Sequence, residues 1–181
     1  QADFPYLAAN LYRQGTEEPW ELAQPALLVD VNDVKIGVVG LALRETPNVT
    51  GAKGVAGLAF GDYAPALRRW VPRLRQEGAQ VILVLAHVCP QDLLALAASV
   101  PDLGIAAFMG GHCHQSLTAE WRAPDGRRSL IGAPTLIGAP SPYWRDYLRV
   151  RLVYDLDAGQ LVAQEQALVE VRYPKGAAPK P

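Results

Sequence analysis

The fold of this chain is decided by two stretches, QVILVLAHVC at residues 80–89 and IAAFMGGHCH at residues 105–114. Each contains an apolar run typical of a buried strand, followed by histidine and cysteine. The residues between them, from 90 to about 100, have the pattern of a helix. A strand–helix–strand unit has parallel strands, whose carboxyl ends meet at one edge of the sheet. We therefore expect the two histidine segments to lie together at the rim of a sheet.

These two segments hold all three histidines and both cysteines of the chain, as His87-Val88-Cys89 and His112-Cys113-His114. Imidazole and thiolate are ligands of zinc and related metals, so the clustering favours a metal site over separate core histidines. In an extended loop, His112 and His114 would face one side and Cys113 the other.

The sequence leaves the state of Cys89 and Cys113 open. Free cysteine packs as a small hydrophobe, and the two thiols are also candidates for a disulfide or for metal ligation. One alternative is a closed structural zinc site made of His87, the two cysteines and either His112 or His114. Four nitrogen and sulfur ligands are the right number, but the spacings differ from those of common zinc folds.

The rest of the chain indicates an α/β fold with a mixed sheet. Residues 26–31 and 34–43 flank Asn32-Asp33 as a hairpin, and the second run is apolar enough for burial on both faces. A helix is expected from Asp62 to about Glu77, ended by Gly78. The remaining expected elements are a strand at 5–10, a loop at 44–61, a hairpin at 121–130, short strands at 129–139 and a final hairpin at 146–155 and 160–171.

The composition fits a single globular domain. The chain has 181 residues, of which 50% are hydrophobic and 19% are charged. This content argues against disorder. The net charge of −1 gives no electrostatic footprint for nucleic acid. No apolar stretch approaches the roughly 18 residues of a membrane span.

The order of strand, His87, helix, strand and GGHCH, followed by hairpins, resembles the second half of the calcineurin-like metallophosphoesterase domain. The similarity is strongest to the 5'-nucleotidase, UDP-sugar hydrolase and 2',3'-cyclic-nucleotide phosphodiesterase group. The segments FPYLAANLY and VNDVKIGVVGLALRETP look like the sequence that follows the GNHE motif in enzymes of this group. The resemblance implies half of a four-layer αββα sandwich, with C-terminal antiparallel hairpins. Residues 1–172 would be the C-terminal part of that domain, and residues 173–181 a linker or tail.

The resemblance also implies a role for each histidine. His87 and His112 would bind one metal of a dinuclear pair, and His114 would bind the other. The pair would be zinc, manganese or iron, and would hold a hydroxide for attack on a nucleotide-like phosphate ester. An extracytoplasmic or periplasmic location is implied by the group alone.

The upstream motifs of the family, D-x-H, G-D and G-N-H-E/D, are not recognisable in this chain. Asp-x-His and Asn-His do not occur, and the only Gly-Asp is Gly61-Asp62 at the expected helix start. We therefore expect a chain that binds one metal ion or none, lacks an identified catalytic acid, and needs the N-terminal half of the domain or self-association. A thiosulfohydrolase-type protein of sulfur oxidation and a non-catalytic metal-binding or interaction module are the alternatives.

Overall fold

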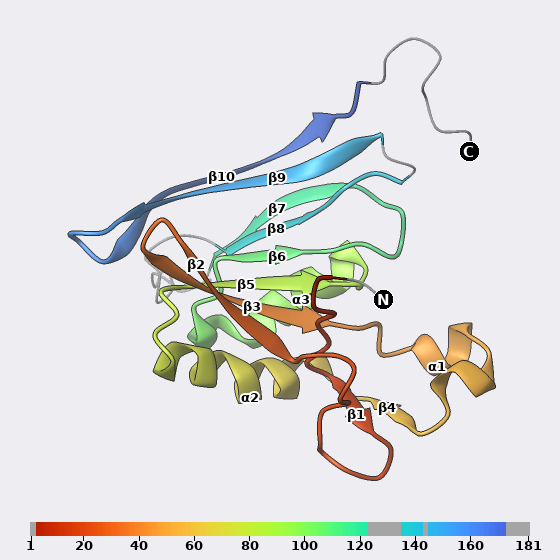
Figure 1. Ribbon diagram of the computed structural model, residues 1–181. Coiled ribbons are helices and arrows are strands. Elements are labelled where there is room, and N and C mark those ends of the chain that lie inside the picture. Colours follow the sequence, from red (N-terminus) through yellow and green to blue (C-terminus); the bar gives the residue numbers. More distant parts are fainter. Residues whose placement is uncertain (1–2, 123–134, 143–144, 173–181) are drawn as a thin grey trace.

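The centre of the structure is a six-stranded mixed sheet (Figure 1). The computed structural model describes residues 3–122, 135–142 and 145–172. The strands lie in the order β2-β3-β5-β6-β8-β7, in which β3, β5, β6 and β8 are parallel and both edge strands are antiparallel to their neighbours. The bounds are Ala26–Val31 (β2), Val34–Leu41 (β3), Val81–Ala86 (β5), Ala107–Met109 (β6), Leu117–Trp121 (β7) and Thr135–Ala139 (β8).

Two helices connect the parallel strands and cover one face of the sheet (Figure 1). Helix α2 (Tyr63–Gln76) joins β3 to β5, and α3 (Pro90–Ser99), followed by a 3-10 turn at Pro101–Leu103, joins β5 to β6. Gly78 follows α2 at a φ of 99°, a conformation that favours glycine. The helices predicted on either side of β5 are therefore confirmed within a residue or two.

The main hydrophobic core lies between these helices and the sheet. Alternate residues of β5, namely Ile82, Val84 and Ala86, are buried on the helical face. Burial of such apolar side chains is the dominant favourable contribution to folding. Their partners on α2 and α3 include Leu67, Val71, Leu74, Leu93 and Leu96.

The opposite face of the sheet is only partly covered. The hairpin of β9 (Asp146–Asp155) and β10 (Gln160–Glu170) packs there, with Leu161 against Val81 and Ala106. Farther along β5, Leu85 is 43% exposed although β5 is a central strand. Val38, on the same face of β3, is half-buried. The expectation that residues 34–43 are buried on both faces is therefore wrong, because the hairpin covers only one end of this face.

The N-terminal region differs from expectation in two places. No strand forms at residues 5–10, where Leu7 makes only an isolated bridge to Gln24; the first strand, β1 (Leu11–Arg13), begins after a turn at Asn10. Residues 44–61 are not one long loop. They contain a one-turn helix, a 3-10 turn and a strand that pairs with β1: α1 (Thr46–Val49), η1 (Ala52–Val55) and β4 (Leu58–Phe60).

The predicted fold class is confirmed. A mixed α/β sheet carries helices on one face and an antiparallel C-terminal hairpin on the other, as half of an αββα sandwich requires. Most of the hairpin predicted at 121–130 and the whole tail at 173–181 lie outside the described residues. In the part of the chain that is described, no helix is long and apolar enough to cross a membrane.

Candidate metal centre

Two of the predicted ligands, His87 and His112, meet at the carboxyl edge of the sheet. His87 follows β5 directly, and its backbone N–H donates to the Leu41 carbonyl at the end of β3 (2.9 Å). His112 follows β6 after two glycines. The Nε2 of His87 lies 3.2 Å from the Nδ1 of His112, with ring centroids 4.9 Å apart. The structure thus brings together two imidazoles that are 25 residues apart in sequence.

The spacing of these nitrogens suits two ligands of one metal ion. Nitrogens at 2.0–2.1 Å from a tetrahedral zinc lie about 3.3 Å from each other. The observed 3.2 Å between the His87 and His112 nitrogens matches that separation. The same distance also allows an N–H···N hydrogen bond between neutral rings, and this bond keeps the two rings together when no ion is bound.

The electrostatic surroundings favour neutral imidazole at His87. Burial lowers the pKa of His87, and positive charge on His112 and His114 lowers it further. Neutral imidazole is the form that binds metal. His114 lies two residues beyond His112 on the same loop.

The backbone of the GGHCH loop is turned rather than extended. His112 and His114 have φ values of 69° and 52°, and the N–H of Cys113 donates to the Gly111 carbonyl (2.8 Å). Left-handed backbone is uncommon outside glycine, and such residues cluster at functional sites. The expectation of simple alternation along an extended loop is therefore wrong.

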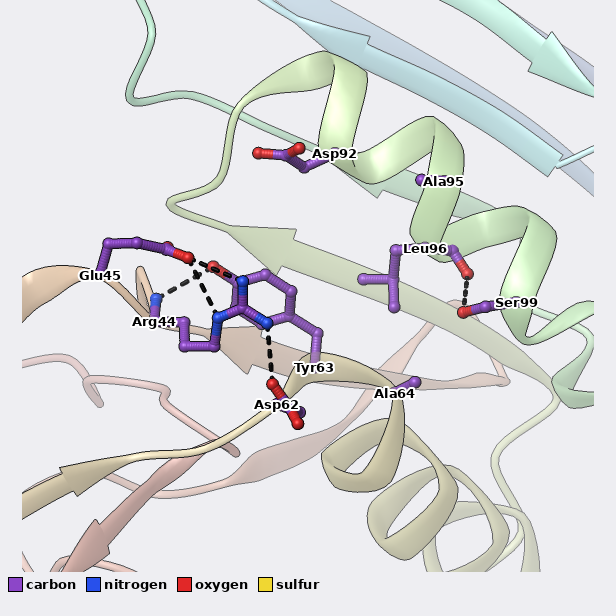
Figure 2. A pocket seen from close by; sticks show the side chains of 9 residues that line it. All are labelled: Arg44, Glu45, Asp62, Tyr63, Ala64, Asp92, Ala95, Leu96 and Ser99. Atoms are coloured by element: carbon purple, nitrogen blue, oxygen red, sulfur yellow. Dashed lines mark hydrogen bonds and ion pairs between the residues drawn. The ribbon is translucent and has the colours of Figure 1, made fainter.

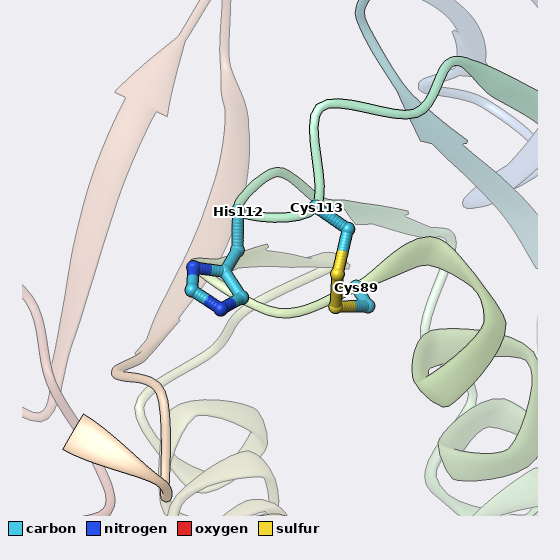
Figure 3. Close-up of side chains that lie close together, drawn as sticks. All are labelled: Cys89, His112 and Cys113. Carbon is cyan, nitrogen blue, oxygen red and sulfur yellow. A yellow bond between two sulfur atoms is a disulfide. The ribbon is translucent and has the colours of Figure 1, made fainter. Parts of the chain in front are cut away.

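A disulfide joins the two histidine segments (Figure 3). Cys89 and Cys113 are bonded, with their Cα atoms 5.1 Å apart. Of the three alternatives that the sequence left open, the structure has the disulfide. A closed zinc site that uses both sulfurs as thiolates does not exist in this state, because disulfide sulfurs are not thiolates.

Gly110 makes room for the contact between the two loops. A Cβ atom at Gly110 would lie 2.6 Å from Cδ1 of Leu93 and 3.1 Å from the Val88 carbonyl oxygen, whereas one at Gly111 would meet only Nδ1 of His87, at 4.0 Å. We expect Gly110→Ala to lower the free energy of unfolding by about 2 kcal/mol through overpacking. Gly111→Ala is the matched control and should change it by less than about 0.5 kcal/mol. Urea unfolding checks both; equal effects of the two substitutions would contradict this close packing.

A pocket of about 510 Å³ lies between the segment after β3 and the helices (Figure 2). Sequence reasoning missed its central group, Arg44, which pairs with Asp62 and Glu45 at 2.8 Å each. The pKa of Arg44 is raised mainly by its hydrogen bond to Asp62 and secondly by its hydrogen bond to Glu45. The hydrogen bond from Arg44 also lowers the pKa of Glu45. Asp62 holds the predicted helix-capping position but bonds Arg44 instead of a helix N–H. The charge of Arg44 is thus neutralised locally, so this pocket is a weak candidate for a phosphate site.

Sequence comparison relates the chain to nucleotide-hydrolysing enzymes, although no family model matches it. It is 28% identical to a 2',3'-cyclic-nucleotide 2'-phosphodiesterase/3'-nucleotidase of Yersinia enterocolitica, over 88% of this chain and 27% of that protein. It is 26% identical to a 5'-nucleotidase of Vibrio cholerae, over 66% of this chain and 23% of that protein. The chain therefore spans about a quarter of the length of these relatives.

Solved structures share its fold. The sulfate thiohydrolase SoxB of Thermus thermophilus superposes with a TM-score of 0.75 at 23% identity, over 93% of this chain and 28% of that one. The calcineurin-like phosphoesterase YfkN of Bacillus subtilis gives 0.71 at 19% identity, over 99% and 58%. The chain thus has the calcineurin-like phosphoesterase fold. Its relatives in sequence include 5'-nucleotidases and 2',3'-cyclic-nucleotide phosphodiesterases, as the resemblance implied.

Proposed function

We propose that this chain supplies the His87, His112 and His114 side of a dinuclear metal centre that hydrolyses nucleotide-like phosphate esters. The observation that carries the proposal is the 3.2 Å separation of the His87 and His112 ring nitrogens at the carboxyl ends of the parallel strands β5 and β6. In this proposal His87 and His112 bind one ion, and His114 binds the other. Zinc, manganese and iron all accept neutral imidazole ligands.

Each part of the site has a defined task in this proposal. His87, His112 and His114 would hold one side of a metal pair, which when bound would supply Lewis acidity toward a phosphate ester and an activated water. The lowered pKa of His87 keeps its imidazole neutral for coordination near pH 7. The disulfide and the left-handed backbone at His112 and His114 restrict the positions of the imidazole rings before a metal binds. This restriction reduces the entropy lost on coordination.

The remaining ligands and the acid are proposed to come from another segment. The motifs that carry them in the family are absent from this sequence, so the chain alone is proposed to bind one ion and not to turn over substrate. The half-open sheet face at Val38 and Leu85 supports a partner, since apolar residues of central strands are normally covered. That partner is the N-terminal half of the domain or, failing that, a second copy of this chain.

An extracytoplasmic location is part of the proposal. The disulfide between Cys89 and Cys113 supports it, because disulfides persist in oxidising compartments and are rare in the cytosol.

A second candidate substrate has a sulfur centre in place of phosphorus. The superposition with a sulfate thiohydrolase motivates it, but at 23% identity that likeness is one of fold. Parallel assays on a phosphodiester and on a thiosulfonate, with the missing half of the domain supplied, distinguish the two. A non-catalytic module is the remaining alternative, and it predicts no turnover even when the missing half is supplied.

The proposal is tested by zinc titration of the oxidised chain, followed by calorimetry. We expect one zinc per chain, and an affinity at least about tenfold lower in His87→Ala and in His112→Asn. Asparagine is chosen at position 112 because it tolerates a positive φ. Ser116→Ala, an exposed change on the same loop, is the control and should bind zinc as the parent chain does.

Two outcomes would contradict the proposal. Zinc binding that is absent, or unchanged by either histidine substitution, would show that His87 and His112 do not share an ion. Hydrolysis of a chromogenic phosphodiester by this chain alone, above a metal blank, would show that the chain is not catalytically incomplete.

A further inference from the structure

A second group of metal-binding atoms lies beside the imidazole pair. One nitrogen of His112 and the sulfurs of Cys89 and Cys113 all lie within 4.8 Å of one another (Figure 3). While the disulfide is intact, the sulfurs are bonded to each other. We propose that reducing the Cys89–Cys113 bond creates a second metal site, made of two thiolates and the His112 imidazole, for a thiophilic divalent cation of the zinc and cadmium class.

The chemistry of the three atoms selects this class of ion. Thiolate sulfur is a soft ligand, and two thiolates with one imidazole are a donor set of tetrahedral zinc and related ions. Hard cations such as magnesium and calcium prefer oxygen and are not expected to bind. Three protein ligands leave the fourth position to water or to another small ligand.

The loops are held together by more than the disulfide, so the cluster should survive reduction. The N–H of Gly111 donates to the Val88 carbonyl (3.1 Å), which joins the two loops, and the N–H of Gly110 donates to the Gly138 carbonyl of β8 (2.7 Å), which anchors the second loop to the sheet. Cys89 lies one residue beyond Val88, and Cys113 two residues beyond Gly111. When the sulfur–sulfur bond breaks, the backbone therefore keeps the two thiols close to each other and to His112.

The reductive step is balanced with a phosphine reductant. The sulfur–sulfur bond breaks, the phosphine gives up two electrons and takes the oxygen of one water molecule, and the two protons of that water end on Cys89 and Cys113. A divalent cation then displaces one proton from each thiol as it binds. Residues 114–116, which follow Cys113, are exposed, so a reductant can approach from solvent.

The new site shares His112 with the proposed phosphoesterase centre but does not use His87. The Nδ1 of His112 faces the Nε2 of His87 at 3.2 Å, so a cation that took this nitrogen to the thiolates would remove it from the pair with His87. The inference does not depend on phosphoesterase activity, because it rests on three ligand atoms and on the redox state of two of them.

The test is a titration of the chain with cadmium, before and after reduction by the phosphine and removal of the reagent. The reduced chain is expected to bind one cadmium and to develop the ultraviolet band of thiolate-to-cadmium charge transfer; the oxidised chain should show no such band. Circular dichroism of the reduced chain, recorded first, shows whether the fold is retained. If the fold is lost on reduction, the proposal is overturned, since the cluster then has no scaffold.

Three variants separate the ligands. Replacing Cys89 and Cys113 together by serine should abolish the band, and His112→Asn should lower cadmium affinity at least about tenfold while leaving a weaker band. Ser116→Ala is the matched control and should titrate as the reduced parent does. A reduced parent with no band, or a His112→Asn chain with unchanged affinity, would overturn the proposal. Zinc binding by the oxidised chain, which reports on His87, is read separately, so either proposal can fail alone.

Discussion

Replacing Asn10 by alanine is expected to lower the free energy of unfolding by about 3 kcal/mol or more, because it leaves buried backbone groups without hydrogen-bond partners. Asn10 is fully buried. Its Nδ2 donates to the carbonyls of Ala42 (2.9 Å) and Gly61 (3.0 Å), and its Oδ1 accepts from the Ala42 N–H (2.9 Å). One side chain thus connects the N-terminal segment, the chain after β3 and the start of α2.

Thermal and urea unfolding measure this effect, with an expected fall in Tm of about 6–12 °C for a domain of this size. Asn10→Asp should also destabilise, since it replaces a donor with an acceptor facing two carbonyl oxygens. Asn48→Ala, at an exposed position, is the control and should change stability by less than about 0.5 kcal/mol. A loss below about 1 kcal/mol in Asn10→Ala would contradict the role assigned to this side chain.

Gly40→Ala is expected to be similarly damaging for a steric reason. A Cβ at Gly40 would overlap the Cβ, carbonyl carbon and carbonyl oxygen of Leu7. Two backbone hydrogen bonds fix the strand here: the Gly40 carbonyl accepts from Ala9 (2.7 Å), and the Gly40 N–H donates to Pro25 (3.3 Å). Because backbone cannot move aside as a flexible side chain can, we expect a loss of about 3 kcal/mol.

Gly54→Ala is the control for this substitution. No atom lies within 4 Å of a Cβ built there, and its backbone does not require glycine. Its stability in urea should equal or slightly exceed that of the parent, because alanine reduces the entropy of the unfolded chain. If Gly40→Ala unfolds at the same urea concentration as Gly54→Ala, the close approach of residues 7 and 40 is not a constraint.

Local pattern was enough to predict the elements around the metal centre. The apolar runs that end at His87 and before Gly110 are strands β5 and β6, and the hairpin around Asn32-Asp33 forms with both turn residues at positive φ. Parallel strands bring their carboxyl ends together whatever the surrounding sequence. The meeting of His87 and His112 therefore followed from topology, and the structure bears it out.

Features that depend on distant partners were not predictable in this way. Asn10 lies in a stretch that reads as a strand, but its side chain bonds groups 32 and 51 residues away and a turn forms instead. The disulfide was one of three open alternatives, because pairing depends on how closely two loops approach. The turned backbone at His112 and His114 has no signal in the sequence, since neither residue is glycine.

The disulfide, both ring nitrogens of the close pair and the left-handed loop all fall between Val81 and His114, within one β5–α3–β6 crossover. One continuous segment, residues 81–114, therefore carries both imidazoles, and backbone hydrogen bonds join it to Leu41 of β3 and Gly138 of β8. Recombination breakpoints placed outside it exchange the sheet edges, the hairpin or the N-terminal segment without separating the two imidazoles, whereas a breakpoint inside it divides them.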